Sequence, residues 1–258
     1  MGSRLFSIAA NTCRETIRNK VLYVILAFGV LVLGLTFFLA DLSMGELARI
    51  IADVGLSALH GFGVVMAVFL GITLVHREVE RRTVYVVLSK PVPRWEFVVG
   101  KALGLGATLA ITTAVMAAVL FAVHASYRWG GGVEPGILVA SLGIYLELLL
   151  LVCLASLFST FTTPELSAIF TLSAFLIGHL TGDLLVFGGR SESALVRESA
   201  RALYFLLPNL EIFNWKNEVV YGGVPVGKVV PLALGYLLAY GSAVLVAACL
   251  LFSRKDFK

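Results

Sequence analysis

The sequence contains six apolar stretches, each long enough to cross a lipid bilayer as a helix. About 20 mainly apolar residues are needed to span the roughly 30 Å hydrocarbon layer. Of the 258 residues, 59% are hydrophobic and only 14% are charged, which excludes an ordinary soluble domain. We therefore predict an all-α integral membrane protein that forms a single transmembrane domain over residues 1–258. The six predicted spans cover residues 21–40, 54–76, 102–123, 137–158, 166–188 and 229–252.

The distribution of cations along the chain predicts its orientation. With the N-terminus inside, 13 of the 20 lysines and arginines fall on the cytoplasmic side and 7 on the other side. Short cytoplasmic loops carry an excess of such residues, so we predict cytoplasmic N- and C-termini, a cytoplasmic loop 77–101 and an external loop 189–228. The first stretch is too long for a secretory signal and is expected to be retained. This topology also explains the net charge of +4 without nucleic acid as a partner, since basic flanks meet anionic lipids.

Two segments outside the spans have helical patterns. Residues 3–19 place apolar side chains near one face, which predicts an interfacial helix before the first span; a polar tail is the alternative. Residues 192–207 have a similar pattern, with Ser191 as a candidate N-cap and Pro208 at the end. We interpret the external loop as a short external or re-entrant lid, against the alternative of an unstructured connector. Gly100 and Gly104 form a GxxxG pair that allows close helix approach.

Four ionisable residues fall inside predicted spans. Such groups are costly in hydrocarbon and normally face a partner or a cavity. Glu147 lies near the middle of its span and is either a proton or substrate-contact site or a hydrogen-bonded tie between helices. His179 and Asp183 share a helical face, where the acid is able to orient the imidazole. This pair either belongs to a transport path or only satisfies its own hydrogen bonds locally. The candidates are His60, Glu147, His179 and Asp183.

The chain lacks the motifs of a catalytic or cofactor-binding protein. Residues 222–229 approach a phosphate-binding loop, but Val229 replaces the hydroxyl residue that would hold magnesium. His60 and His124 are too scattered to complete a zinc set, and no HExxH motif is present. Three scattered cysteines and four methionines indicate neither a disulfide framework nor a copper path. We predict a non-enzyme with no catalytic residue, cofactor or metal site of its own, whose ATPase, if ATP drives it, is a separate chain.

The basic segment 77–101 is the strongest candidate for a partner site. It carries charges of both signs around an apolar run and a proline pair, a pattern typical of a short amphipathic helix that docks in a groove. A solvated loop that obeys the positive-inside rule is the alternative. Its sequence from residue 78 onward, EVERRTVYVVLSKPVPRWEFVVGKALG, resembles the cytoplasmic loop of ABC-2 type permeases. The N-terminal run AANTCRETIRNKVLYVIL and the later run LPNLEIFNWKNEVVYGG are also similar to that family, close to its nitrous-oxide-reductase maturation branch.

The resemblance implies the membrane subunit of an ATP-binding cassette (ABC) transporter, usually an exporter. It implies six helices per subunit, a homo- or heterodimer of permease subunits, and a separate ATPase subunit that binds ATP and Mg. The expected location is the cytoplasmic (inner) membrane of a prokaryote. The family's coupling helix, between the second and third spans, maps here onto Glu78, Glu80, Arg81, Arg82, Thr83, Lys90, Pro91 and Arg94.

Two other functions remain open at the level of sequence. One is an ion-coupled secondary carrier that works through Glu147, His179 and Asp183. Such carriers often have internal repeats and broken helices, and no repeat between the two halves is evident here. The other is a noncatalytic membrane scaffold whose basic loop binds a partner without transport.

Overall fold

The computed structural model describes residues 2–41, 47–80, 93–127, 136–190, 193–216, 218 and 226–254. All regular elements within these ranges are helices, as predicted. In chain order they are α1 (Gly2–Ile17), α2 (Lys20–Asp41), α3 (Leu47–Glu80), α5 (Arg94–Tyr127), α6 (Gly136–Phe161), α7 (Pro164–Arg190), α8 (Ala194–Leu206), η1 (Glu211–Phe213) and α10 (Val226–Arg254).

Five of the described helices, and a sixth if one bent pair is counted, could cross a membrane. Within the described residues, α3, α5, α6, α7 and α10 are each long and apolar enough to cross a membrane. A sixth candidate is the pair α1 and α2, whose axes differ by 64° at a short break. The predicted first span lies in α2, and the predicted interfacial helix corresponds to α1. Helices rather than strands are required because a single chain segment in hydrocarbon must satisfy its own backbone hydrogen bonds.

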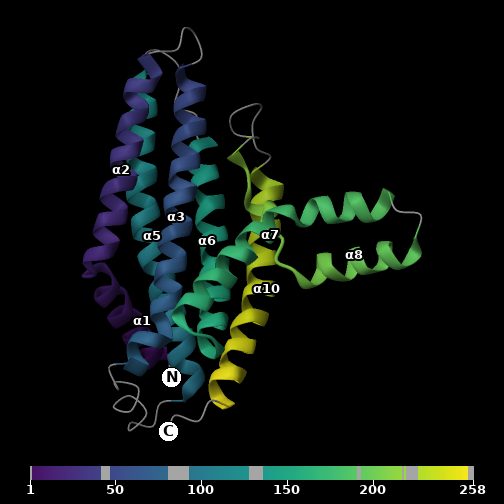
Figure 1. Ribbon diagram of the computed structural model, residues 1–258. Coiled ribbons are helices and arrows are strands. Elements are labelled where there is room, and N and C mark those ends of the chain that lie inside the picture. Colours follow the sequence, from purple (N-terminus) through teal and green to yellow (C-terminus); the bar gives the residue numbers. More distant parts are fainter. Residues whose placement is uncertain are drawn as a thin grey trace.

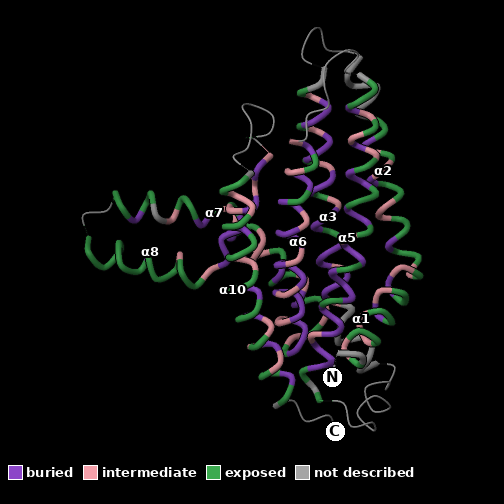
Figure 2. The backbone as a smooth tube through the Cα atoms, turned by 180° about the vertical axis from the view of Figure 1, so that it is seen from behind, coloured by how far each residue is buried: buried purple, intermediate pink, exposed green. Residues whose placement is uncertain are grey.

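The core lies where α3, α5 and α6 face one another. These helices run side by side with α2, while α7 and α10 pack on the opposite flank (Figure 1). Buried residues gather on the facing sides of the central helices, and exposed residues follow the outer sides of α2 and α10 (Figure 2). Gly63 and Gly71 let α3 approach α6, because a Cβ atom there would lie 2.6 Å from Leu148 and 2.2 Å from Ala155. Small residues at such contacts maximise helix packing where lipid supplies no hydrophobic drive.

The GxxxG pair of α5 packs against α1. A Cβ atom on Gly104 would come within 2.6 Å of the Ala9 carbonyl oxygen, and one on Gly100 within 2.8 Å of Ile8. Thr12 and Thr16 are buried on the same side of α1. The close approach expected from these glycines is therefore present, and its partner is the N-terminal helix.

α7 and α8 form a hairpin that extends sideways from the bundle. The end of α7 lies beside α8 in both views (Figure 1, Figure 2), and a Cβ atom on Gly188 would come within 2.6 Å of Ala200. The predicted helix over 192–207 is confirmed as α8, but Ser193 occupies its N-cap position and makes no side-chain cap bond. Ser191 lies outside the described residues. α8 exposes Leu195, Phe205 and Leu206, so apolar surface as well as charge faces outward.

The segment after α8 turns back into the bundle. Leu210, Phe213 and Trp215 are buried, with exposed fractions of 0–3%. Hydrogen bonds hold the segment in place: Tyr236 Oη accepts from the Asn209 backbone NH at 2.7 Å, and the Gly178 carbonyl accepts from the Leu210 NH at 3.0 Å. The described part of the connection is thus a largely exposed helix, α8, followed by a largely buried segment, 208–215, and not an unstructured connector.

Gly104→Ala is expected to destabilise the fold, because the added methyl group meets the backbone of α1 rather than a flexible side chain. Overpacking of this kind costs about 1–3 kcal/mol. Gly61→Ala is the matched control, since nothing lies within 4 Å of its Cβ position and alanine is favoured over glycine in a helix. Thermal unfolding in detergent should give a lower Tm for Gly104→Ala and an unchanged or higher Tm for Gly61→Ala. Equal Tm values would show that α1 does not pack on α5.

Candidate functional site

Four ionisable side chains from distant parts of the sequence meet inside the bundle. His60 Nε2 lies 2.9 Å from Glu147 Oε1, and His179 Nε2 lies 3.6 Å from the same oxygen. Lys216 Nζ lies 2.9 Å from His60 Nδ1, on the other side of that ring. Glu147 is 1% exposed and His60 is 7% exposed. We call these four residues the polar cluster.

Glycines bring the elements of the polar cluster together. Gly63 lets α3 approach α6, as described above. Gly143 of α6 leaves room for the segment after η1, because a Cβ atom there would lie 2.6 Å from the Phe213 carbonyl oxygen and 2.8 Å from Trp215. Gly178 of α7 likewise leaves room for Leu210, because a Cβ atom on Gly178 would lie 2.6 Å from the Leu210 side chain. These approaches place Lys216, which directly follows Trp215, next to His60.

Lys216, His60 and Glu147 are joined in a chain of two hydrogen bonds. An ammonium group has donors only, so Lys216 donates to His60 Nδ1 and the ring proton stays on Nε2, where it is donated to Glu147. Burial lowers the pKa of Lys216 from its ordinary value, while the negative charges of Glu147, Glu211 and Asp53 oppose that shift. The Glu147 carboxylate therefore faces a hydrogen-bonded imidazole and, beyond it, a lysine.

His179 is oriented differently. Its Nδ1 lies 3.1 Å from the Phe175 carbonyl oxygen, which only accepts hydrogen bonds, so Nδ1 carries the proton. Its Nε2 has no hydrogen-bond partner and faces Glu147 at 3.6 Å, too long for a hydrogen bond. The Phe175 ring packs against both imidazoles, with centroid distances of 5.5 Å to His60 and 4.7 Å to His179. His179 thus presents Nε2 to the Glu147 carboxyl group without a hydrogen bond between them.

The structure assembles three of the four predicted intramembrane residues and leaves out the fourth. Asp183 is exposed, and in the described residues no hydrogen bond or ion pair joins it to His179, whose ring is oriented by the backbone of Phe175 instead. Lys216 was missed, because the sequence places it in the external loop. The only signal was its position directly after Phe213 and Trp215, in a segment too apolar for an exposed connector.

The predicted coupling residues surround the break between α3 and α5. Glu78 and Glu80 lie in the last turn of α3, and Arg94 begins α5. The remaining ones lie outside the described residues, as does the predicted amphipathic helix itself. These are Arg81, Arg82, Thr83, Lys90 and Pro91.

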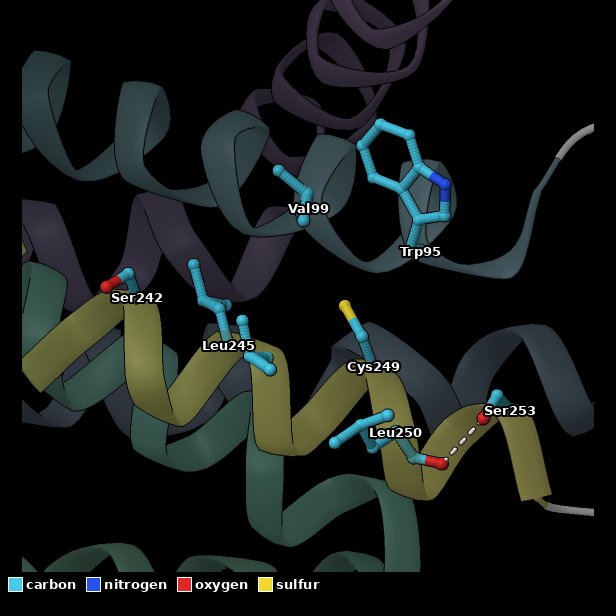
Figure 3. A pocket seen from close by; sticks show the side chains of 8 residues that line it. Trp95, Val99, Ser242, Leu245, Cys249, Leu250 and Ser253 are labelled. Carbon is cyan, nitrogen blue, oxygen red and sulfur yellow. Dashed lines mark hydrogen bonds between the residues drawn. The ribbon is translucent and has the colours of Figure 1, made fainter.

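A separate apolar pocket of about 710 Å³ lies between the start of α5 and the end of α10. Trp95 and Val99 line one side, and Cys249 lies on the other (Figure 3). Its two serine hydroxyls donate to backbone carbonyls of α10, from Ser253 to Leu250 and from Ser242 to Ala239. The lining holds no charged residue, so this pocket suits hydrocarbon, as bilayer lipid supplies, and not a polar ligand.

The fold and its buried ionisable groups define a multi-pass membrane protein of the transporter class. The chain belongs to the ABC-2 family of transporter proteins, because the model of that family, described as "ABC-2 family transporter protein", matches residues 6–257. It is therefore a permease component of an ABC transporter. Comparison with curated proteins gave no match.

Glu147→Leu is expected to lower stability more than Glu147→Gln. Leucine leaves the buried His60 Nε2–H group without an acceptor, at a cost of about 1–3 kcal/mol, whereas the glutamine oxygen still accepts from His60. Unfolding in detergent, monitored by circular dichroism, compares the stabilities of the two variants. Glu198→Leu on α8 is the control, because the Glu198 side chain is 68% exposed and surface changes usually stay within about 0.5 kcal/mol. A Glu147→Leu protein as stable as the parent would show that the polar cluster contributes nothing to stability.

Proposed function

We propose that this permease is part of an exporter driven by a separate ATPase subunit, which docks on segment 77–101. The ATPase binds ATP and Mg, and this chain binds no cofactor for that step. Two permease subunits, identical or different, form the membrane dimer, in the inner membrane of a prokaryote. We further propose that the chain lies near the nitrous-oxide-reductase maturation branch of the family, a proposal supported by the resemblance of segments 78–104 and 207–223.

The position of the basic segment carries the proposal. The end of α3 and the start of α5 lie at the same end of the bundle as both chain termini (Figure 1). Each of these helices has 34 residues and is about 50 Å long at 1.5 Å per residue, well beyond the roughly 30 Å of hydrocarbon. Six cations lie between Arg77 and Lys101. A partner at this end would therefore reach α3 and α5 outside the hydrocarbon.

The packing of α3 and α5 explains how a docked partner would move the bundle. Both helices continue from the docking segment into the core, where α3 contacts α6 through Gly63 and Gly71. α1 follows α5, because Gly100 and Gly104 hold the two helices in contact. A displacement of the segment on ATP-driven closure would shift α3, α5 and α1 relative to α6. For this to work, the ATPase must bind the two arrangements with different affinity.

The two alternatives predict different energy requirements. An ion-coupled carrier that uses Glu147, His179 and Asp183 would transport in the absence of ATP and stop when an uncoupler abolishes the ion gradient. A scaffold would bind a partner without any effect of cargo on ATP hydrolysis. An ABC permease, in contrast, changes the ATPase rate of its partner. Family membership favours the ABC permease. Copurification with the tagged chain would identify its ATPase partner.

Arg81→Glu with Arg82→Glu is expected to release the ATPase subunit while the membrane fold stays intact. Reversal of two charges turns attraction into repulsion at a charged interface, which costs several kcal/mol and lowers recovery of the partner at least about tenfold. The tagged protein is isolated in gentle detergent, copurified chains are identified by mass spectrometry, and ATP hydrolysis is assayed.

The matched control is Arg197→Glu with Arg201→Glu, which makes the same charge change on exposed positions of α8. This control should keep both the partner and the ATPase activity. Unchanged recovery and activity in the Arg81 and Arg82 variant would overturn the docking assignment. A chain that never copurifies with an ATPase from intact membranes would overturn the proposed energy source.

A further inference from the structure

We propose that His60, Glu147 and His179 form a binding site for one divalent transition-metal ion of the zinc type. The inference concerns a resident ion and is independent of the ATP-driven function proposed above. The sequence indicated no metal site, because the three residues are separated by 87 and 32 positions along the chain. The fold brings one donor atom from each within 4.8 Å of the other two.

The two donor separations from Glu147 are close to those of tetrahedral coordination. Zinc binds imidazole nitrogen and carboxylate oxygen at about 2.0–2.2 Å, which places neighbouring ligand atoms ~3.4 Å apart. The two separations from Glu147 Oε1, 2.9 Å to His60 Nε2 and 3.6 Å to His179 Nε2, lie on either side of that value. Small side-chain rotations suffice to admit an ion. Two imidazoles and a carboxylate leave a fourth position for water or another ligand.

The chemistry of the donors selects the class of ion. Calcium and magnesium prefer sites made of oxygen ligands, and two of the three donors here are nitrogens. Imidazole suits zinc, copper, iron and nickel. No cysteine or methionine belongs to the set, so the soft ligands that favour Cu(I) are absent from this site.

His179 already has the arrangement of a metal ligand. Metal-bound histidines almost always donate their second ring NH to a carbonyl or a carboxylate, which fixes the tautomer and the ring orientation. His179 Nδ1 makes this bond to the Phe175 carbonyl, and the Phe175 ring holds the imidazole from the side. Its Nε2 has no hydrogen-bond partner. This nitrogen lies 3.6 Å from Glu147 Oε1 with no hydrogen bond between them, so both atoms are available to coordinate one cation.

Lys216 is the part of the polar cluster that opposes a metal ion. Its cation lies 2.9 Å from His60 Nδ1, where a metal-bound histidine would instead need an acceptor. Lys216 belongs to the segment after η1 and its side chain is long, so it is able to turn away when an ion enters and His60 coordinates through Nε2. Lys216 therefore sets the affinity of the site, and its removal should strengthen binding.

The test measures zinc binding by the full-length protein, purified with a tag that contains no histidine. After treatment with a chelator, the protein is dialysed against Zn²⁺ and the bound metal is measured by mass spectrometry. Co²⁺ is then substituted, because its visible absorption distinguishes tetrahedral nitrogen and oxygen ligands from water. We expect one ion per chain, a tetrahedral Co²⁺ spectrum and a rise in Tm with added Zn²⁺.

Variants assign the ion to this site. His179→Gln and Glu147→Gln should each weaken Zn²⁺ binding at least about tenfold, since even the loss of an outer-sphere partner costs 10–100-fold. Lys216→Gln should bind Zn²⁺ more tightly, because it removes the opposing charge and supplies an acceptor for His60. His124→Gln, which changes a buried histidine of α5 outside the polar cluster, should leave binding unchanged.

Three results would overturn the proposal: no zinc retained by the parent protein, a Co²⁺ spectrum typical of water ligands, or equal binding by His179→Gln and the parent. If a ligand variant fails to fold, the proposal is still tested by the Co²⁺ spectrum of the parent protein and by the Zn²⁺ affinity of Lys216→Gln relative to the parent. Weaker binding by Lys216→Gln would also count against the site, since Lys216 would then be a partner of the ion's ligands. Loss of zinc with intact partner ATPase activity would leave the proposed function untouched.

Discussion

The buried carboxyl group of Glu147 is the group that most requires hydrogen-bond and charge partners in this structure. It lies near the middle of α6 and is almost fully buried, where an unpaired charge is too costly to persist. Three other elements supply these partners. His60 comes from α3, His179 comes from α7, and Lys216 of the segment after η1 contacts His60 from its other side. Glu147 therefore connects α6 directly to α3 and α7 and, through His60, to the segment after η1.

The segment that follows α8 has a larger role than a connection between two spans. It inserts Leu210, Phe213 and Trp215 into the core and is held by Tyr236 of α10 and the backbone of α7. Any movement of this segment would change the distance between Lys216 and His60. The polar cluster therefore links the α7–α8 hairpin to α3, which leads in turn to the proposed docking segment. Such a link couples the hairpin to the docking segment only if the helices adopt two arrangements that each of them favours differently.

Most of the fold follows from local features of the sequence. The six apolar stretches specify six helices because hydrocarbon allows a single segment no other way to satisfy its backbone. The amphipathic patterns of residues 3–19 and 192–207 predicted α1 and α8, and the Gly100 and Gly104 pair predicted a close helix contact. The exact start of α8 was wrong, because several neighbouring serine and acidic residues are equally good capping signals and only the backbone path selects Ser193. The burial of Leu210, Phe213 and Trp215 was not predicted, because sequence alone does not distinguish an aromatic group in the core from one at the bilayer surface.

The sequence by itself determined that this chain is a multi-pass helical membrane protein with buried ionisable groups and a basic loop between two spans. It also indicated the ABC-2 family, which the match over residues 6–257 confirms. Only the tertiary structure decided which ionisable groups meet: it joined Glu147 to His60, His179 and Lys216 and left Asp183 exposed. The physical reason is that helix formation depends on neighbours within a few residues, whereas the polar cluster depends on where separate helices can approach. Those approaches are set by glycines and buried side chains far apart in the chain, and their pairing is specified only when the whole bundle packs.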